Sequence, residues 1–414
     1  MGRANGDRAL IEAAVAAMGN GPLTEAGLRQ HVWPLFSRVR AACEARGEIY
    51  LANHSLGRPL DQTADDVAAG LNLWYDRLDG AWDDDAWPGE MDRFRERVAK
   101  LIGLKDAKAV VPKTSAGQGL RAVLNALPNR TLRIVATRGE FDSIDFILKA
   151  YADKGRADIR WVEPTRYDQG VPLFETQALI DAIEPGIDLV VVSHVAFTTG
   201  QVVADLKAVS EAAHAANALL LVDVYHAVGV LPVEMGDVDF LIGGSYKYTR
   251  GGPGACWLAI HPSRLGMRTL DTGWFAKESP FRYERPDPPR FGGGGDAWLE
   301  STPPVLTLYQ AAAGQRLTLA LGVARLREYN LRQQEVLRQA FCDHGVPCFQ
   351  PANPTEFGAF ALVPHSEPRA FSNALRAAGV NTDSRGSFVR FGPDLLNSDD
   401  ELREAARITA EVGR

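Results

Sequence analysis

The feature that most constrains the fold is a series of short apolar segments separated by stretches with helical spacing, between residues 109 and 260. Continuous apolar runs that alternate with helices are typical of a mostly parallel sheet buried on both faces. We therefore predict an α/β fold with helices on both faces of the sheet. The predicted strands are 109–111, 133–136, 159–162, 189–193, 218–223, 240–243 and 256–260, and the predicted helices are 114–127, 144–151, 174–183 and 205–216.

The C-terminal part of the chain shows a second alternation of helices and strands. We predict helices over 305–343, 369–378 and 399–412, and strands over 360–363 and 388–391. Because 414 residues are too many for one small core, we divide the chain into three parts. These are an N-terminal segment that packs with the small domain, a large domain and a smaller C-terminal α/β domain, with bounds 1–60, 61–300 and 301–414.

Two further local patterns precede and follow the predicted sheet. Helical spacing recurs over 60–78 and 90–102, and the acidic run 83–85 between them is predicted to be a solvated loop. The glycine run 292–295 is predicted to be a flexible loop.

Charge and composition exclude several classes of protein. A net charge of −7 argues against a nucleic-acid partner. The four cysteines are scattered without metal-ligand spacing, so we expect no metal site and no disulfide framework, and the cytoplasm is the default compartment. No apolar run is long enough to span a bilayer, and the N-terminus lacks the core of a signal peptide, so no membrane association is expected.

An acid and a lysine follow two neighbouring predicted strands. Asp223 ends one strand, and Lys247 follows the next within GGSYKYTRGG. Ligands of open α/β sheets bind beyond the carboxyl ends of the strands. An isolated acid there is often a helix cap, and a loop lysine is usually exposed. Together they are the pair that pyridoxal 5′-phosphate (PLP) chemistry requires: the lysine forms a Schiff base, and the carboxylate keeps the pyridine nitrogen protonated.

Motifs along the chain resemble the class V aminotransferase superfamily, and more closely its kynureninase-like branch. They run in order from about residue 48 to 410 and read IYLANHSLG, SHVAFTTGQVVAD, DVYHAVG, SYKY, TGWFAK and VRFGPDLLNS. The resemblance implies a fold-type I PLP transferase-like fold, PLP as cofactor and an amino-acid substrate. It also implies a homodimer whose subunits share their sites.

The resemblance assigns cofactor-binding roles to residues at the ends of predicted strands. Thr114 and Ser115 open a helix whose amides would hold the phosphate. Phe141 would stack on the cofactor ring, although a core aromatic is the alternative. His226 would lie near the phosphate or the ring, whereas His194 can equally be a buried histidine without a ligand.

Three other residues receive roles at the phosphate. Tyr246 would donate to the phosphate or act as an acid–base group; alternatively, it packs beside Lys247. Trp274 would reach the phosphate of the neighbouring subunit. Thr302 stands in STPP, where kynureninases read SNPP, and its surroundings resemble a class V segment whose threonine reaches a phosphate across the dimer.

Arg390 and His54 are the predicted substrate-binding residues. An arginine fork binds a carboxylate bidentately, so Arg390 is assigned to the substrate α-carboxylate; a solvated salt bridge is the alternative. His54 precedes the SLG motif, at the end of a segment that reads DGN in the family.

The cofactor leaves the reaction open, because the pocket decides which bond of the amino acid breaks. The leading hypothesis is a kynureninase-like hydrolase, in which Lys247 removes the α-proton and water cleaves the Cβ–Cγ bond of a γ-keto amino acid, releasing alanine. Thr302 and the lack of a ring-contacting histidine near residues 80–90 depart from that pattern.

Other reactions of the superfamily remain alternatives. They are an aminotransferase and a C–S lyase. A desulfurase needs a reactive loop cysteine, and Cys342 and Cys348 stand in an ordinary turn. A non-enzymatic PLP-fold protein would have lost Lys247 or Asp223, and both are present.

Overall fold

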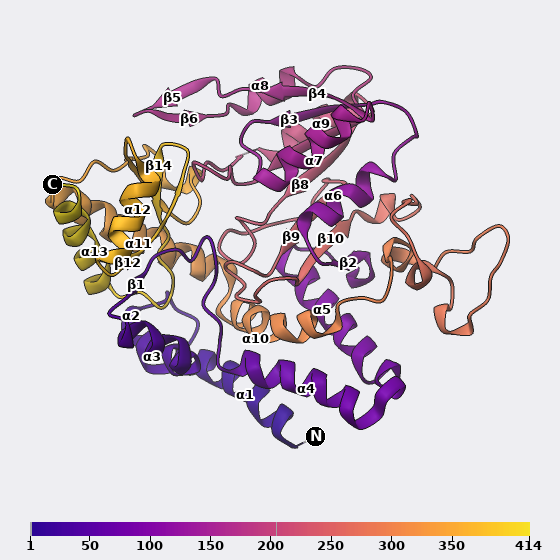
Figure 1. Ribbon diagram of the computed structural model, residues 1–414, viewed down its shortest axis with the longest axis horizontal. Coiled ribbons are helices and arrows are strands. Elements are labelled where there is room, and N and C mark those ends of the chain that lie inside the picture. The colour runs from indigo at the N-terminus through magenta and orange to yellow at the C-terminus, as the bar shows by residue number, and fades with distance from the viewer. Residues whose placement is uncertain (1, 204) are drawn as a thin grey trace.

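The computed structural model describes residues 2–203 and 205–414. Within them, the large central sheet has the strand order β2-β10-β9-β8-β7-β3-β4 (Figure 1). Its neighbours run parallel except for β10, which is antiparallel to both β2 and β9. The predicted mostly parallel sheet is therefore confirmed. The strands are β2 Val110–Lys113, β3 Leu132–Thr137, β4 Ala157–Val162, β7 Leu189–Ser193, β8 Leu219–Asp223, β9 Phe240–Gly244 and β10 Cys256–Ile260.

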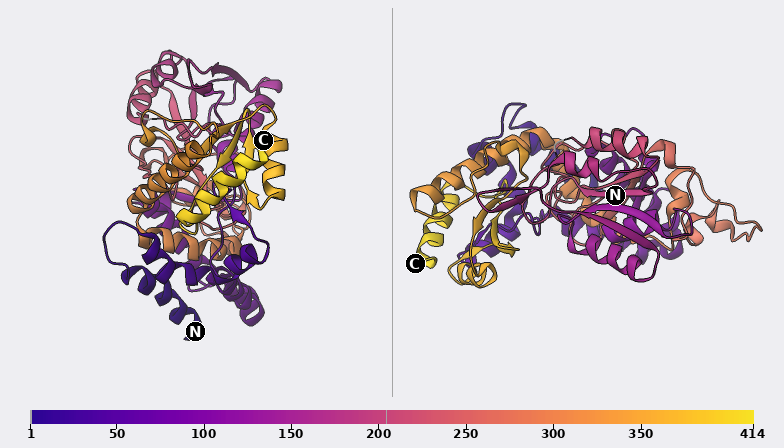
Figure 2. Two further views of the ribbon diagram at one scale, coloured as in Figure 1. Left: turned by 90° about the vertical axis from the view of Figure 1, so that its left-hand side faces the viewer. Right: turned by 90° about the horizontal axis from the view of Figure 1, so that it is seen from above.

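Helices cover both faces of this sheet (Figure 2). In β7, Val190 and Val192 pack against one layer of helices, and Leu189 and Val191 pack against the other. This two-sided burial explains why the strand reads as a continuous apolar run. One face carries α5 Trp87–Leu101, α8 Thr176–Asp181, α9 Leu206–Ala215 and α10 Val305–Leu321, and the other carries α6 Ala116–Leu124 and α7 Asp142–Asp153.

A smaller antiparallel sheet with the order β11-β14-β13 lies on the left of Figure 1. Its apolar side chains share a core with the helices α11, α12 and α13. The elements are β11 Ala361–Pro364, β13 Asp383–Arg385, β14 Phe388–Phe391, α11 Val323–Asp343, α12 Pro368–Ala377 and α13 Asp399–Val412.

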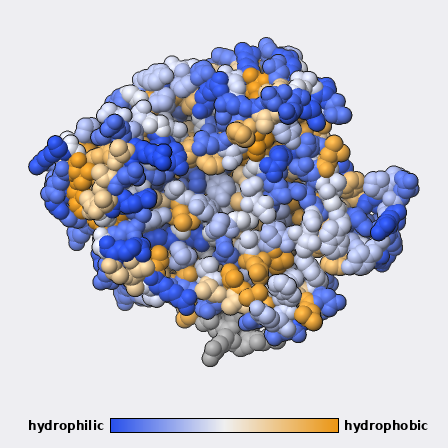
Figure 3. Space-filling view, in the orientation of Figure 1, coloured by the Kyte–Doolittle hydropathy of each residue, from blue (hydrophilic) through white to orange (hydrophobic). Residues whose placement is uncertain are grey.

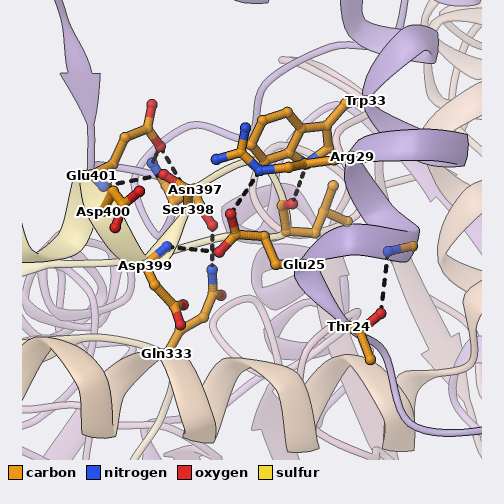
Figure 4. Close-up of polar contacts among 12 residues, drawn as sticks. Thr24, Glu25, Arg29, Trp33, Gln333, Asn397, Ser398, Asp399, Asp400 and Glu401 are labelled. Atoms are coloured by element: carbon orange, nitrogen blue, oxygen red, sulfur yellow. Dashed lines mark hydrogen bonds and ion pairs between the residues drawn. The ribbon is translucent and has the colours of Figure 1, made fainter.

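The N-terminal segment also contacts this part of the chain. Its strand β1 (Ile49–Tyr50) pairs in parallel with β12 (Val380–Asn381). Glu25 accepts the backbone amide of Asp399, and Trp33 donates its indole N–H to the carbonyl of Leu395 (Figure 4). The other N-terminal helices are α1 Gly2–Ala16, α2 Glu25–Gly27, α3 Ser37–Ala45 and α4 Gln62–Arg77. α10 follows residue 300 but packs on α4 and α5, which precede it in the chain. The domain bounds at residues 60 and 300 stay a prediction.

The structure corrects several predicted elements. The single helical pattern over 305–343 is two helices, because Gly322 has a φ of 83° between α10 and α11. That backbone conformation is not helical and favours glycine. A hairpin of β5 (Arg166–Asp168) and β6 (Val171–Leu173) was not predicted. The glycine run 292–295 is partly ordered, since a 3-10 turn covers Gly294–Trp298. The acidic run 83–85 is exposed, as predicted.

Hydrophobic residues on the face shown in Figure 3 form separate patches among hydrophilic ones. Within the described residues, no helix is long and apolar enough to cross a membrane. In the same part of the chain, no group of three or more His, Cys, Asp or Glu side chains could hold a metal ion.

Candidate functional site

A cavity of about 550 Å³ opens at the carboxyl edge of the large sheet, and we call it the central cavity. β8 ends at Asp223, and β9 ends three residues before Lys247, so both side chains reach the same edge. Residues of β13 and β14 close the cavity from the small sheet. The predicted site residues that line it are His54, Thr114, Ser115, Phe141, Asp223, His226, Tyr246, Lys247 and Arg390.

Asp223 and His226 are buried in the wall of the central cavity, and the half-buried Lys247 lies beside them. The Asp223 carboxylate accepts the amide of Tyr225 at 2.8 Å, and Lys247 Nζ donates to His226 Nε2 at 2.5 Å. Burial raises the pKa of Asp223 and lowers the pKa of Lys247, while attraction between the two opposes both changes. Burial, followed by the nearby Lys247, lowers the pKa of His226, so this histidine is a neutral acceptor. An amine with a lowered pKa is a ready nucleophile toward a carbonyl carbon.

Aromatic rings surround the Lys247 amine. The Phe141 ring centroid lies 5.9 Å from Nζ, and the Tyr225 centroid lies 5.3 Å from it. Phe141 is 37% exposed, which is unlike a core aromatic, and its ring meets Phe197 edge-on at 4.8 Å. Phe197 was not predicted as a site residue. The cofactor-stacking role of Phe141 stays a prediction.

The N-terminus of α6 forms another wall of the central cavity. Ser115 is the N-cap and accepts the amide of Gln118 at 3.1 Å. The Gln118 side-chain oxygen accepts both the amide of Thr114 at 2.8 Å and its hydroxyl at 3.1 Å. Glu300 anchors Gln118 and pairs with Lys113 at 2.8 Å. Backbone N–H groups at a helix N-terminus favour a bound anion. In this structure the Gln118 side-chain oxygen accepts the hydrogen bonds that Thr114 could otherwise donate to such an anion.

Arg390 lies in a buried network that was only partly predicted. It is 1% exposed, and its Nε and Nη2 donate to the two carboxylate oxygens of Asp383 at 2.8 and 2.5 Å. Its Nη1 donates to the carbonyl of Phe197 at 2.5 Å, and His54 Nε2 contacts Asp383 at 2.7 Å. The alternative of a solvated salt bridge is therefore wrong, because Arg390 is buried where it pairs with Asp383.

The same network controls the protonation of its members. Burial lowers the pKa of His54 to about 4, so its ring is neutral and donates to Asp383. Burial favours the neutral form of Asp383, but contacts with His54 and Arg390 outweigh it and lower the pKa of this carboxyl. The sequence offered no signal for Asp383, because its contact with Arg390 depends on the register of β13 and β14.

Glu140 is another residue that the sequence pattern did not predict. It is buried and accepts from the hydroxyl of Thr137 at 2.5 Å, the amide of Ser193 at 3.1 Å and the hydroxyl of Ser193 at 2.6 Å. Burial raises the pKa of Glu140 to about 7, and the nearby Asp223 adds to the rise. A carboxyl group next to Phe141 therefore titrates near neutrality.

Three predicted or considered residues lie outside the central cavity. Trp274 packs edge-on against Phe275, with ring centroids 4.4 Å apart, and Thr302 is exposed. Their reach toward a neighbouring subunit stays a prediction. His194 lines a different pocket, and its buried Nδ1 has no hydrogen-bond partner among the described residues.

Neither C-terminal cysteine belongs to the cavity wall. Cys342 is exposed, and burial raises the pKa of Cys348 to about 12. Since the thiolate is the reactive form, Cys348 is not an activated thiol.

Comparisons with known proteins agree on one family. The family model described as "Aminotransferase class-V" matches residues 88–383. The chain is 29% identical to a kynureninase of Pseudomonas fluorescens, covering 88% of this chain and 89% of that protein. It is 27% identical to a kynureninase of Salinispora tropica, covering 84% and 86% of the two chains.

Solved structures share the fold. The apo structure of a cysteine desulfurase from Thermococcus onnurineus NA1 has a TM-score of 0.75 at 18% identity, and covers 88% of this chain and 94% of its own. A mutant of C-DES, with glycine covalently linked to its PLP cofactor, has a TM-score of 0.77 at 18% identity. The match covers 87% of this chain and 96% of the C-DES chain.

Proposed function

The chain belongs to the aminotransferase class-V family, and we propose that it is a kynureninase-like hydrolase. It would cleave the Cβ–Cγ bond of kynurenine or a related γ-keto amino acid and release alanine. The cofactor is PLP, as in the other enzymes of this family. The observation that carries the proposal is the meeting of Asp223, Lys247 and Arg390 in one cavity, in a chain whose kynureninase relatives match over most of its length.

The residues of the central cavity fit PLP. A buried carboxylate, a lysine with a lowered pKa and a helix N-terminus suit the pyridine nitrogen, the aldehyde carbon and the phosphate, respectively. The buried Nδ1 of His226 has no partner within the described chain, so it is left for a bound group. A cavity of about 550 Å³ has room for a cofactor together with a small amino acid.

Each of these residues would have a distinct task. When bound, PLP supplies an electron sink for the negative charge that develops on the substrate. Lys247 would hold the group through Nζ and would take up the substrate α-proton. Asp223 would keep a proton on the pyridine nitrogen. Arg390 would bind the α-carboxylate, which orients the bond to be broken. Tyr246, which also lines the cavity, would donate to the phosphate.

The hydrolase proposal is tested with kynurenine and 3-hydroxykynurenine. We expect fluorescent anthranilate products and one alanine for each turnover, and no product from the Lys247→Ala variant. A protein that carries the cofactor absorbance band at the border of the visible and ultraviolet ranges, but forms neither product, would refute the hydrolase. A protein without the band would refute the assignment of the cofactor to this cavity.

An aminotransferase or a C–S lyase is the second candidate. Thr302 and the lack of a ring-contacting histidine near residues 80–90 favour it, because the pocket for the kynurenine side chain then differs from that of kynureninases. If a keto acid restores turnover after a single half-reaction, the aminotransferase is correct. Sulfide or persulfide release from cysteine or cystine would indicate the lyase.

We further propose a cytoplasmic homodimer with shared sites. Trp274 and Thr302 lie outside the cavity of their own chain, so the phosphate of a second subunit is the partner that we assign to them. Size-exclusion chromatography with light scattering tests the dimer. Mixing Lys247→Ala with Trp274→Ala subunits tests the shared site, because the mixed dimer would regain one intact site.

A further inference from the structure

Two guanidinium groups and the Lys247 amine surround the ring of Phe197 in the wall of the central cavity. The ring centroid lies 5.9 Å from Lys247 Nζ, 5.4 Å from Arg385 Cζ and 4.9 Å from Arg390 Cζ. Both arginines line the cavity, and both lower the pKa of Lys247 through charge repulsion. This part of the cavity wall, which we call the arginine wall, is therefore a cationic region beside the reactive amine.

A single carboxylate faces the two arginines from within the protein. Asp383 accepts two hydrogen bonds from Arg390, and its Oδ2 lies 3.9 Å from Arg385 Nη1. His54, the other contact of Asp383, is neutral because burial lowers its pKa to about 4. Among Arg385, Arg390 and Asp383, two guanidinium groups and one carboxylate leave one positive charge, which matches one carboxylate of a ligand.

The two arginines differ in what they offer that ligand. A guanidinium has five N–H donors. Arg390 uses one on Nε and one on Nη2 for Asp383, and one on Nη1 for the Phe197 carbonyl. One donor on each terminal nitrogen remains, and such a pair can bind a carboxylate end-on. The Arg385 side chain is 40% exposed, and its Nη1 donates to the Ser384 carbonyl at 2.7 Å.

We propose that Arg385 and Arg390 together clamp the α-carboxylate of the substrate, with Arg390 fixing its orientation and Arg385 supplying the charge that Asp383 does not compensate. This inference rests on the proposed amino-acid substrate. It makes Arg385 a determinant of specificity. A substrate with one carboxylate and an uncharged side chain neutralises the arginine wall, whereas a second carboxylate finds no guanidinium charge left to balance it.

Two competing roles for Arg385 lead to different results. In the first, Arg385 binds an anion at the far end of an acidic substrate side chain. In the second, Arg385 is a solvated arginine at the cavity rim and contributes little, as exposed charges usually do. Ligands that differ only in one carboxylate separate these roles from the clamp.

The test is a spectral titration of the PLP-loaded protein with L-alanine, L-alaninamide and L-aspartate. The variants are Arg385→Gln, which removes the charge, and Arg385→Lys, which keeps it but removes the fork. Arg403→Gln is the matched control, because it removes a guanidinium that is exposed on α13 and outside the cavity. Hydrogen bonds to charged groups correspond to a ten- to hundred-fold change in Kd.

We expect the lower end of that range for this half-exposed side chain. Arg385→Gln should raise the Kd for alanine about ten-fold, Arg385→Lys should raise it less, and the Kd for alaninamide should change less than two-fold. The salt dependence of alanine binding should also weaken in Arg385→Gln, because one charge is lost. Arg403→Gln should match the unmodified protein throughout.

An unchanged Kd for alanine in Arg385→Gln would overturn the clamp. An equal loss of affinity for alanine and alaninamide would also overturn it. A loss of affinity for aspartate alone would overturn the clamp and would show instead that Arg385 binds the side-chain carboxylate of an acidic substrate. The titration follows binding and not hydrolysis. If the alanine result holds but kynurenine is not cleaved, the hydrolase is wrong and the clamp stands.

Discussion

The buried carboxyl group of Glu140 should make the protein less stable as the pH rises toward neutrality. Burial raises the pKa of this group from an ordinary value of 4.5 to about 7. The unfolded chain releases the proton near pH 4.5, whereas the folded chain keeps it until about pH 7. Over that window the folded state binds more protons, so stability falls as the pH rises. One pKa unit corresponds to about 1.4 kcal/mol, so the full loss is about 3 kcal/mol and is complete above pH 7.

Glu140→Gln isolates this contribution. The glutamine oxygen can accept from Thr137 and the Ser193 amide, and its NH₂ group can donate to the Ser193 hydroxyl, as a protonated glutamate would. Urea unfolding is measured at pH 5 and pH 8 with saturating PLP. Glu211→Gln, at an exposed position on α9, is the matched control.

At each pH, the unfolding free energy of Glu140→Gln is compared with that of the unmodified protein, so the contributions of all other titrating groups cancel. Relative to the unmodified protein, Glu140→Gln should gain about 2 to 3 kcal/mol of unfolding free energy between pH 5 and pH 8. The control should gain nothing. If the stability curves of Glu140→Gln and the unmodified protein stay parallel across this range, Glu140 does not hold a proton in the folded state, and the reasoning from its burial is refuted.

Three further predictions follow from the central cavity. Lys247→Ala should abolish the near-visible absorbance band of the PLP-loaded protein; a retained band would exclude Lys247 as the covalent attachment point. Asp383→Asn should keep the band and lower the Kd for alanine about ten-fold, because two uncompensated guanidinium charges then face the substrate carboxylate; spectral titration measures this, and an unchanged or raised Kd would contradict it. Gly392→Ala should cost about 1 to 3 kcal/mol in urea unfolding, because its Cβ would lie 2.3 Å from His54 Nδ1; an unchanged midpoint would show that the ring moves freely.

Several elements could be predicted from the sequence with accurate bounds. The strands β7 and β10 and the helix α13 begin and end where the sequence pattern places them. Each strand is a short apolar run that is buried throughout, and Ser398 starts α13 with a capping box. These signals are local, so no tertiary information is needed to read them.

The hairpin of β5 and β6 shows where local signals fail. Its strands have three residues each. No residue of β5 is buried, whereas Val171 and Leu173 of β6 are buried and pack against aromatic residues of the small sheet region. A pattern this short carries little periodicity. Its burial depends on a partner surface that lies far away in the sequence.

By itself, the sequence determined the kind of chemistry, because Asp223 and Lys247 follow strands of one parallel sheet, and such strands end at a common edge. Only the tertiary structure decided how the charges at that edge are paired. Asp383 meets Arg390 through the register of two short strands, and His54 and Phe197 join them from distant parts of the chain. These contacts depend on how the small sheet packs against the large one, and no periodicity along the chain encodes that arrangement.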